Sequence, residues 1–274
     1  MKKTSKTYVV IWDHVLKNGL RIDEQLTRAK IDYMVWDLNP VPQNRTNWVT
    51  AEKVWYYGHF YNSLEDFAKT DHGIFIFNAG DAYSDHHADF VRIVEDQMSA
   101  DEDIWIMAPR MVNDTSEGVF SLIQMSKSHE QMGLMTHING IYVAMSREAA
   151  LDILEYYRWL LKNNYMDFSV MVTGHCLDKV CAAWAIYNNK KVYRKWDFSM
   201  RTEISTSYEL NTAYSDCKNI KDRFAEYLET LGKDPEPLRK IYEAIEDKDR
   251  KFRTEPYPLL KIYVNLENEE DLDY

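Results

Sequence analysis

Acidic and polar residues directly follow three short apolar stretches in the first third of the chain. The stretches are YVVIW (8–12), YMVW (33–36) and GIFIF (73–77), and the residues behind them include Asp13, His14, Asp37, Asn78 and Asp81. A carboxylate held rigidly at the end of a buried strand can coordinate a divalent cation that is bound to phosphate oxygens. The pattern therefore predicts a site for a phosphate-bearing ligand. In a simpler interpretation, Asp81 and Asp85 only cap a turn and a helix.

A second group of candidate residues is basic. Between residues 190 and 201 the chain has five basic residues and one acid, a local charge of +4 in a chain whose formal net charge is -11. The basic residues are Lys190, Lys191, Arg194, Lys195 and Arg201, and Tyr193, Trp196 and Phe198 lie among them. Cationic side chains with interleaved aromatic rings bind phosphates and stacked bases. A solvated strand whose lysines extend their charged ends into water is the alternative interpretation.

The elements that must position these residues alternate along the chain. Apolar stretches predict strands at 8–12, 33–36, 73–77, 104–108, 141–145 and 192–196, with 54–57 as a weaker candidate. Helical spacing predicts helices at 21–30, 62–69, 85–98, 146–162 and 177–187, with Asp85 and Ser146 as N-caps, and two more at 220–231 and 237–245. This alternation favours an α/β layered domain with a mostly parallel sheet and a C-terminal helical extension. Ligands of such sheets bind at the carboxyl ends of the strands.

Several function classes lose support from composition and missing motifs. The chain contains no GxGxxG, GxxxxGK, HExxH or GxSxG, and its three cysteines lack CxxC spacing. The adjacent His86 and His87 would point about 100° apart on a helix, which disfavours a histidine metal centre. The acidic balance disfavours binding of nucleic acid or anionic lipid over the whole surface. No apolar run approaches the roughly 18 residues of a membrane span, so we expect a cytoplasmic protein without membrane contact.

Three passages resemble the GT-A class of nucleotide-sugar glycosyltransferases. AGDA (79–82) stands where that class often has EDDA, so the resemblance makes Asp81 a metal ligand. NGIYVAMSREA (139–149) resembles the later glycine, strand and helix passage, and GHCLDKV (174–180) resembles the acidic helix start. Asp178 would then stand beside the acceptor hydroxyl and take or orient its proton. The class often has a further histidine ligand, but the chain has no histidine after His175, so Asp197 is the expected substitute.

The resemblance implies one GT-A-like Rossmann-type domain over residues 1–200, followed by a helical extension (201–264) and an acidic tail (265–274). It implies hexosyl or pentosyl transfer from a nucleotide-sugar donor such as a UDP-sugar to a hydroxyl, with Mn²⁺ or Mg²⁺ as cofactor. The donor-binding residues it implies are Trp12, Asp13, His14, Asp37, Asp81 and Arg194. The acceptor-binding residues are Asn139, Gly140, His175, Lys190, Lys191, Lys195 and Arg201. The catalytic residue is Asp178, and the metal ligands are Asp81 and Asp197.

The acceptor remains open between several alternatives. The small size and the basic aromatic segment resemble the bacteriophage enzymes that glycosylate hydroxymethylated pyrimidines, which predicts duplex DNA as a partner and the host cytoplasm as the location. A glycan or protein hydroxyl is the rival acceptor. Because AGDA has fewer acids than the motif it resembles, a non-catalytic protein that binds nucleotide sugars, for example in host takeover, is the third hypothesis.

Overall fold

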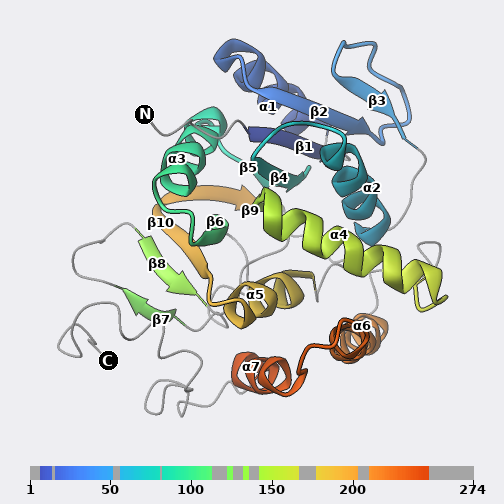
Figure 1. Cartoon of the computed structure of the whole chain (residues 1–274). Helices are drawn as coiled ribbons and strands as arrows, with labels where there is room; N and C mark the ends of the chain where they lie inside the picture. Colours follow the sequence, from blue (N-terminus) through green and yellow to red (C-terminus); the bar gives the residue numbers. More distant parts are fainter. Residues whose placement is uncertain are drawn as a thin grey trace.

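The structure is a computed structural model, and it describes residues 7–13, 16–51, 56–80, 82–112, 122–125, 132–135, 142–166, 177–202 and 210–246. Within these residues the chain forms seven α-helices and one ten-stranded sheet (Figure 1). The strands are β1 (Thr7–Asp13), β2 (Asp32–Asp37), β3 (Trp48–Thr50), β4 (Ile74–Ala79), β5 (Ala82–Tyr83), β6 (Ile104–Val112), β7 (Leu122–Met125), β8 (Met132–Met135), β9 (Tyr142–Ser146) and β10 (Lys191–Thr202). The helices are α1 (Leu16–Ala29), α2 (Tyr56–Ala68), α3 (His87–Ala100), α4 (Arg147–Lys162), α5 (Leu177–Tyr187), α6 (Leu210–Thr230) and α7 (Glu236–Glu246).

The sheet is mixed, but most of its described strands point the same way. The strand order is β3-β2-β1-β4-β9-β6-β10-β8-β7, and β5 pairs with the last residues of β10. The pairs β1–β2, β1–β4, β2–β3 and β6–β10 are parallel, whereas β9 runs antiparallel between β4 and β6. Strands β1, β2, β4, β6 and β10 therefore end at one edge of the sheet, here called the carboxyl edge. The expected α/β class with a mostly parallel sheet is confirmed.

Helices cover both faces of the sheet (Figure 1). The ring of Phe90 on α3 lies 5.4 Å from that of Tyr142 on β9, and Phe60 on α2 lies 5.1 Å from Phe77 on β4. Asn78 and Tyr142 are register partners, so their side chains share one face, and Phe77 points to the other. Helices α1 and α3 thus pack on one face, and α2 and α4 on the opposite face. Burial of β4 along its whole length explains its continuous apolar run.

The local predictions have mixed outcomes. The predicted cap Ser146 is confirmed, because its hydroxyl accepts the backbone N–H of Ala149 at 3.2 Å. The cap predicted for Asp85 is wrong: the N-cap of α3 is His86, and Asp85 instead accepts a hydrogen bond from the Tyr83 hydroxyl. The weaker strand candidate at 54–57 is wrong at residues 56 and 57, because α2 begins at Tyr56, and residues 54 and 55 lie outside the described part of the chain. Strands β7 and β8 were not anticipated.

The C-terminal helices pack against the α/β layers. Phe224 of α6 contacts Tyr156 of α4 and Trp184 of α5, with ring centroids 4.6 Å and 5.4 Å away. The Tyr156 hydroxyl donates to the carbonyl oxygen of Ile220. Helix α6 begins at Leu210, earlier than the predicted residue 220, and α7 agrees closely with its prediction. The acidic tail lies outside the described residues, and no helix among those described is long and apolar enough to cross a membrane.

Candidate functional site

The carboxyl edge gathers the strand ends that carry the predicted donor-binding residues. The backbone register pairs Asp13 of β1 with Asp37 of β2, and pairs Trp12 with Trp36 on one side and Ala79 of β4 on the other. This is where ligands of parallel α/β sheets bind. The predicted residues His14 and Asp81 fall outside the described part of the chain. Donor binding by these residues stays a prediction.

The Asp37 carboxylate organises the loop that follows β2. Its side chain is buried, and one oxygen accepts the backbone N–H of Asn39 at 3.0 Å and the Asn39 side-chain amide at 2.8 Å. The other oxygen accepts the backbone N–H of Gln43 at 2.6 Å. A buried carboxylate requires such donors, because burial otherwise strongly penalises its charge. Asp37 therefore fixes the shape of residues 39–43 at the carboxyl edge.

Two amide side chains of α1 hold the turn after β4, and sequence analysis missed both. The buried Asn18 side chain donates to the carbonyl oxygen of Gly80 at 3.1 Å. The Gln25 side chain donates to the carbonyl oxygen of Ser84 at 2.9 Å and accepts the backbone N–H of His87 at 2.7 Å. These bonds anchor the chain on both sides of position 81. A signal existed in the sequence, because two amides seven residues apart share the α1 face that buries Ile22.

An exposed arginine of β10 lies beside this turn, because β10 pairs there with β5. Arg201 of β10 pairs in register with Tyr83 of β5, and Arg201 is exposed. The guanidinium of Arg21 on α1 lies 5.0 Å from the centroid of the Tyr83 ring. The carboxyl edge therefore has positive charge beside the turn after β4, which can attract a phosphate-bearing ligand.

The five basic residues of the 190–201 segment do not lie together on one exposed surface. Lys190 and Lys191 lie at the opposite edge of the sheet, where they pair with Asp103 and Asp101, each at 2.7 Å. The other members are Arg194 and Lys195, which are buried in β10, and Arg201. At about 3.3 Å per strand residue, Lys191 and Arg201 lie roughly 30 Å apart. These charges are close together in the sequence but far apart in the folded structure.

The predicted acceptor and catalytic residues fall largely outside the described side chains. Asp178 is the second residue of α5, as expected for a first-turn acid, and Asp197 lies in β10 where the pairing with β6 shifts register between Lys195 and Ser199. Only the backbone of these two residues is described. Asn139, Gly140 and His175 lie outside the described residues. Their acceptor-binding and catalytic roles stay predictions.

A metal site is not formed by the side chains that the structure describes. Among them, no group of three histidine, cysteine, aspartate or glutamate side chains is arranged to hold an ion. The Asp37 carboxylate is engaged by three donors within its own loop. Metal binding thus rests on the sequence prediction for Asp81 and Asp197.

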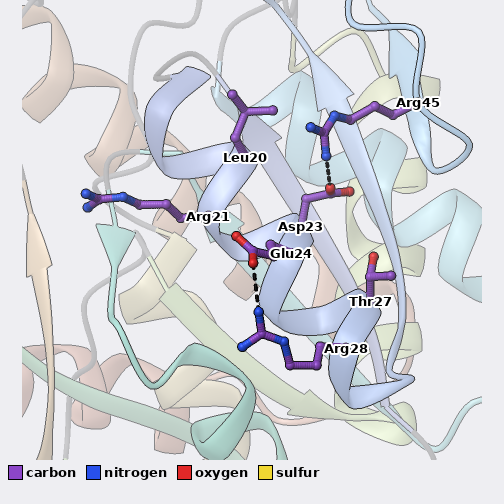
Figure 2. A pocket seen from close by; sticks show the side chains of 7 residues that line it. All are labelled: Leu20, Arg21, Asp23, Glu24, Thr27, Arg28 and Arg45. Atoms are coloured by element: carbon purple, nitrogen blue, oxygen red, sulfur yellow. Dashed lines mark hydrogen bonds and ion pairs between the residues drawn. The ribbon is translucent and has the colours of Figure 1, made fainter.

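A shallow pocket of about 490 Å³ is lined by side chains of α1 and by Arg45 (Figure 2). Its lining residues are Leu20, Arg21, Asp23, Glu24, Thr27, Arg28 and Arg45. The buried Asp23 carboxylate pairs with Arg45 and accepts the Tyr33 hydroxyl at 2.5 Å and the Trp48 indole N–H at 2.9 Å. These bonds tie α1 to β2 and β3. The residues around this pocket therefore hold α1 against β2 and β3.

Comparisons with known proteins identify the fold. No protein-family model and no curated protein sequence matches this chain. The structure of GalNAc-T7 with UDP, GalNAc and Mn²⁺ is similar, with 11% sequence identity and a TM-score of 0.53 over 96% of this chain, which spans 58% of that one. The mannosyltransferase PcManGT from Pyrobaculum calidifontis, in complex with GDP-Man and Mn²⁺, has 11% identity and a TM-score of 0.49, covering 98% of this chain and 78% of its own. At this identity, the likeness to GalNAc-T7 shows a fold similar to that of the GT-A glycosyltransferases.

Proposed function

We propose that the protein is a glycosyltransferase that moves a sugar from a nucleoside-diphosphate donor to a hydroxyl. The observation that carries this proposal is the turn after β4, which α1 anchors at Gly80 and Ser84, at the edge where β1, β2 and β4 end. A glycosyltransferase must hold charged groups rigidly against the departing diphosphate, and an anchored turn provides that rigidity. The fold likeness to GalNAc-T7 is further support.

In the proposed reaction, different residues have different roles. We assign the nucleoside side of the site to Asp13, His14 and Asp37, and Asp81 with Asp197 would hold Mn²⁺ or Mg²⁺. A bound divalent cation would neutralise negative charge on the leaving diphosphate. Arg201 adds positive charge from β10. Asp178, in the first turn of α5, orients the acceptor hydroxyl and accepts its proton.

For the acceptor, we favour a glycan or protein hydroxyl over the hydroxymethylpyrimidine of bacteriophage DNA. A protein that binds duplex DNA needs several cations on one surface, because affinity comes largely from phosphate neutralisation. Here two of the five basic residues predicted for that role are ion-paired at the opposite edge, and two more are buried. Binding to a duplex that weakens steeply with salt would reverse this preference.

Donor hydrolysis with and without acceptor tests the proposal. UDP- and GDP-sugars are offered with Mn²⁺, and released nucleoside diphosphate is measured for the wild type and for Asp81→Asn and Arg201→Ala. We expect Asp81→Asn to abolish turnover and Arg201→Ala to reduce it about tenfold, the equivalent of roughly 1.4 kcal/mol. Asp103→Asn and Lys190→Ala are matched controls, because these two residues form a surface ion pair at the opposite edge, away from the carboxyl edge. Unchanged turnover in Asp81→Asn would remove its assigned role.

The non-catalytic hypothesis predicts a different result in the same assay. A protein that only binds nucleotide sugars would gain thermal stability from the donor, since a ligand of the native state stabilises it. It would release no diphosphate under any condition. Donor binding without hydrolysis or transfer would therefore replace the enzyme proposal with a binding function.

A further inference from the structure

Three buried polar side chains lie together below the carboxyl edge. Asn78 on β4 and Tyr142 on β9 are direct register partners, and both point to the face covered by α3. The ring of His87, the first residue of α3, lies 5.5 Å from the Tyr142 ring in an edge-on arrangement. All three residues are 0% exposed. The cluster adjoins the turn after β4, because Asn78 is two residues before Gly80.

Each member of the cluster has hydrogen-bonding capacity that no described residue uses. The Asn78 amide N–H group donates to the carbonyl oxygens of Ala79 and Ala82 at 2.9 Å and 3.2 Å, which fixes its orientation and directs Oδ1 away from them. Among the described residues, Asn78 Oδ1, the Tyr142 hydroxyl and both ring nitrogens of His87 have no hydrogen-bond partner. Buried polar atoms in folded proteins nearly always have one, so such a concentration calls for an explanation.

The side chains of the cluster carry no net charge at neutral pH. Burial lowers the pKa of His87 to about 3, and it raises the pKa of Tyr142 well above its ordinary value. Both side chains are therefore uncharged at neutral pH, and Asn78 carries no charge. Together they offer one acceptor oxygen, one hydroxyl, and a ring with one donor and one acceptor. That set matches a group which both donates and accepts hydrogen bonds, and it carries no charge that would balance the charge of a phosphate or a metal cation.

We propose that Asn78, His87 and Tyr142 form a hydroxyl-binding site beneath the turn after β4. The ligand group is an O–H, supplied either by a buried water or by a hydroxyl of the donor sugar. The second source rests on the proposed function, whereas the first does not. A water with three polar partners is a normal constituent of a protein interior.

Removing single polar atoms tests the site. Tyr142→Phe deletes only the hydroxyl, and Tyr242→Phe on α7 is the matched control. Tyr242 is likewise buried, its hydroxyl has no partner among the described residues, and its helix packs on α5 and α6. Melting temperatures are measured without ligand, with UDP or GDP, and with UDP-GalNAc or GDP-mannose, all with Mn²⁺. His87→Phe is the second variant, because it keeps an aromatic ring but removes both nitrogens.

The outcomes separate the two sources of the hydroxyl. A ligand-free melting temperature about 2–4 °C lower in Tyr142→Phe than in Tyr242→Phe supports a bound water. A normal ligand-free value with about tenfold weaker binding of the nucleotide sugar, but unchanged binding of the nucleotide, supports a sugar hydroxyl. If Tyr142→Phe and His87→Phe are as stable as the wild type and bind every probe equally, the site does not exist. Absence of any nucleotide-sugar shift in the wild type would refute the proposed function, while the ligand-free comparison would still decide the water site.

Discussion

The hydrogen bond from Asn18 to Gly80 gives the sharpest test of how the candidate site is held. Asn18→Leu keeps a side chain of similar size but removes the donor, and it leaves the buried Gly80 carbonyl without that partner. An unsatisfied buried acceptor costs about 1–3 kcal/mol. At roughly 2–4 °C per kcal/mol for a chain of this size, the melting temperature should fall by about 2–12 °C. Donor turnover should fall with it, because the turn carrying Asp81 loses one of its two anchors.

Asn163→Leu is the matched control for this experiment. The Asn163 side chain also donates to a backbone carbonyl, that of Trp159 at 2.7 Å, but it is exposed at the end of α4. Water can replace that bond, so the expected change in stability is within about 0.5 kcal/mol. Calorimetry and the diphosphate-release assay are run on both variants. Equal melting temperatures would refute the energetic argument, and full turnover in a destabilised Asn18→Leu would show that the anchor serves the fold alone.

Three further predictions concern the scaffold. Because burial lowers the pKa of His87 to about 3, the unfolded chain binds a proton that the folded chain excludes, and stability should fall by about 1.4 kcal/mol per pH unit below pH 6.5. Guanidinium unfolding from pH 4 to 7 should give His87→Phe a flatter slope, and identical slopes would contradict the assignment. Arg158 bonds Glu65 at 2.8 Å and 2.6 Å and lowers the pKa of Glu65 to about 2, so this pair stabilises the fold above pH 4.5 and weakens towards pH 2. Glu65→Gln should cost about 1 kcal/mol at pH 7 and less at pH 3, and a cost independent of pH would argue against the pair. Asp23→Asn removes the charge that pairs with Arg45 and should cost about 2 kcal/mol in urea unfolding, whereas an unchanged midpoint would show that this junction is not stabilising.

Local patterns in the sequence determined the element types and the α/β class. The continuous apolar run of β4 predicted a strand buried on both faces, and Ser146 predicted the start of α4, because both signals depend on residues close together in the chain. The same signals predicted which strand ends carry carboxylates. Since parallel strands end at one edge, the sequence also predicted that Asp13 and Asp37 lie at the same edge, whereas their direct pairing was shown by the strand register.

Only the tertiary structure decided what each side chain meets across long separations in sequence. Asn18 and Gly80 are 62 residues apart, and nothing local to either residue indicates their bond. Lys190 and Lys191 belong to a basic segment of the sequence, yet each pairs with a carboxylate 87 or 90 residues away, at the opposite edge. Along a strand, the rise per residue separates neighbouring charges, and successive side chains point to opposite faces. Tertiary packing then determines which groups each charge contacts. The sequence therefore predicts the edge at which the site lies, whereas long-range packing determines which side chains anchor it.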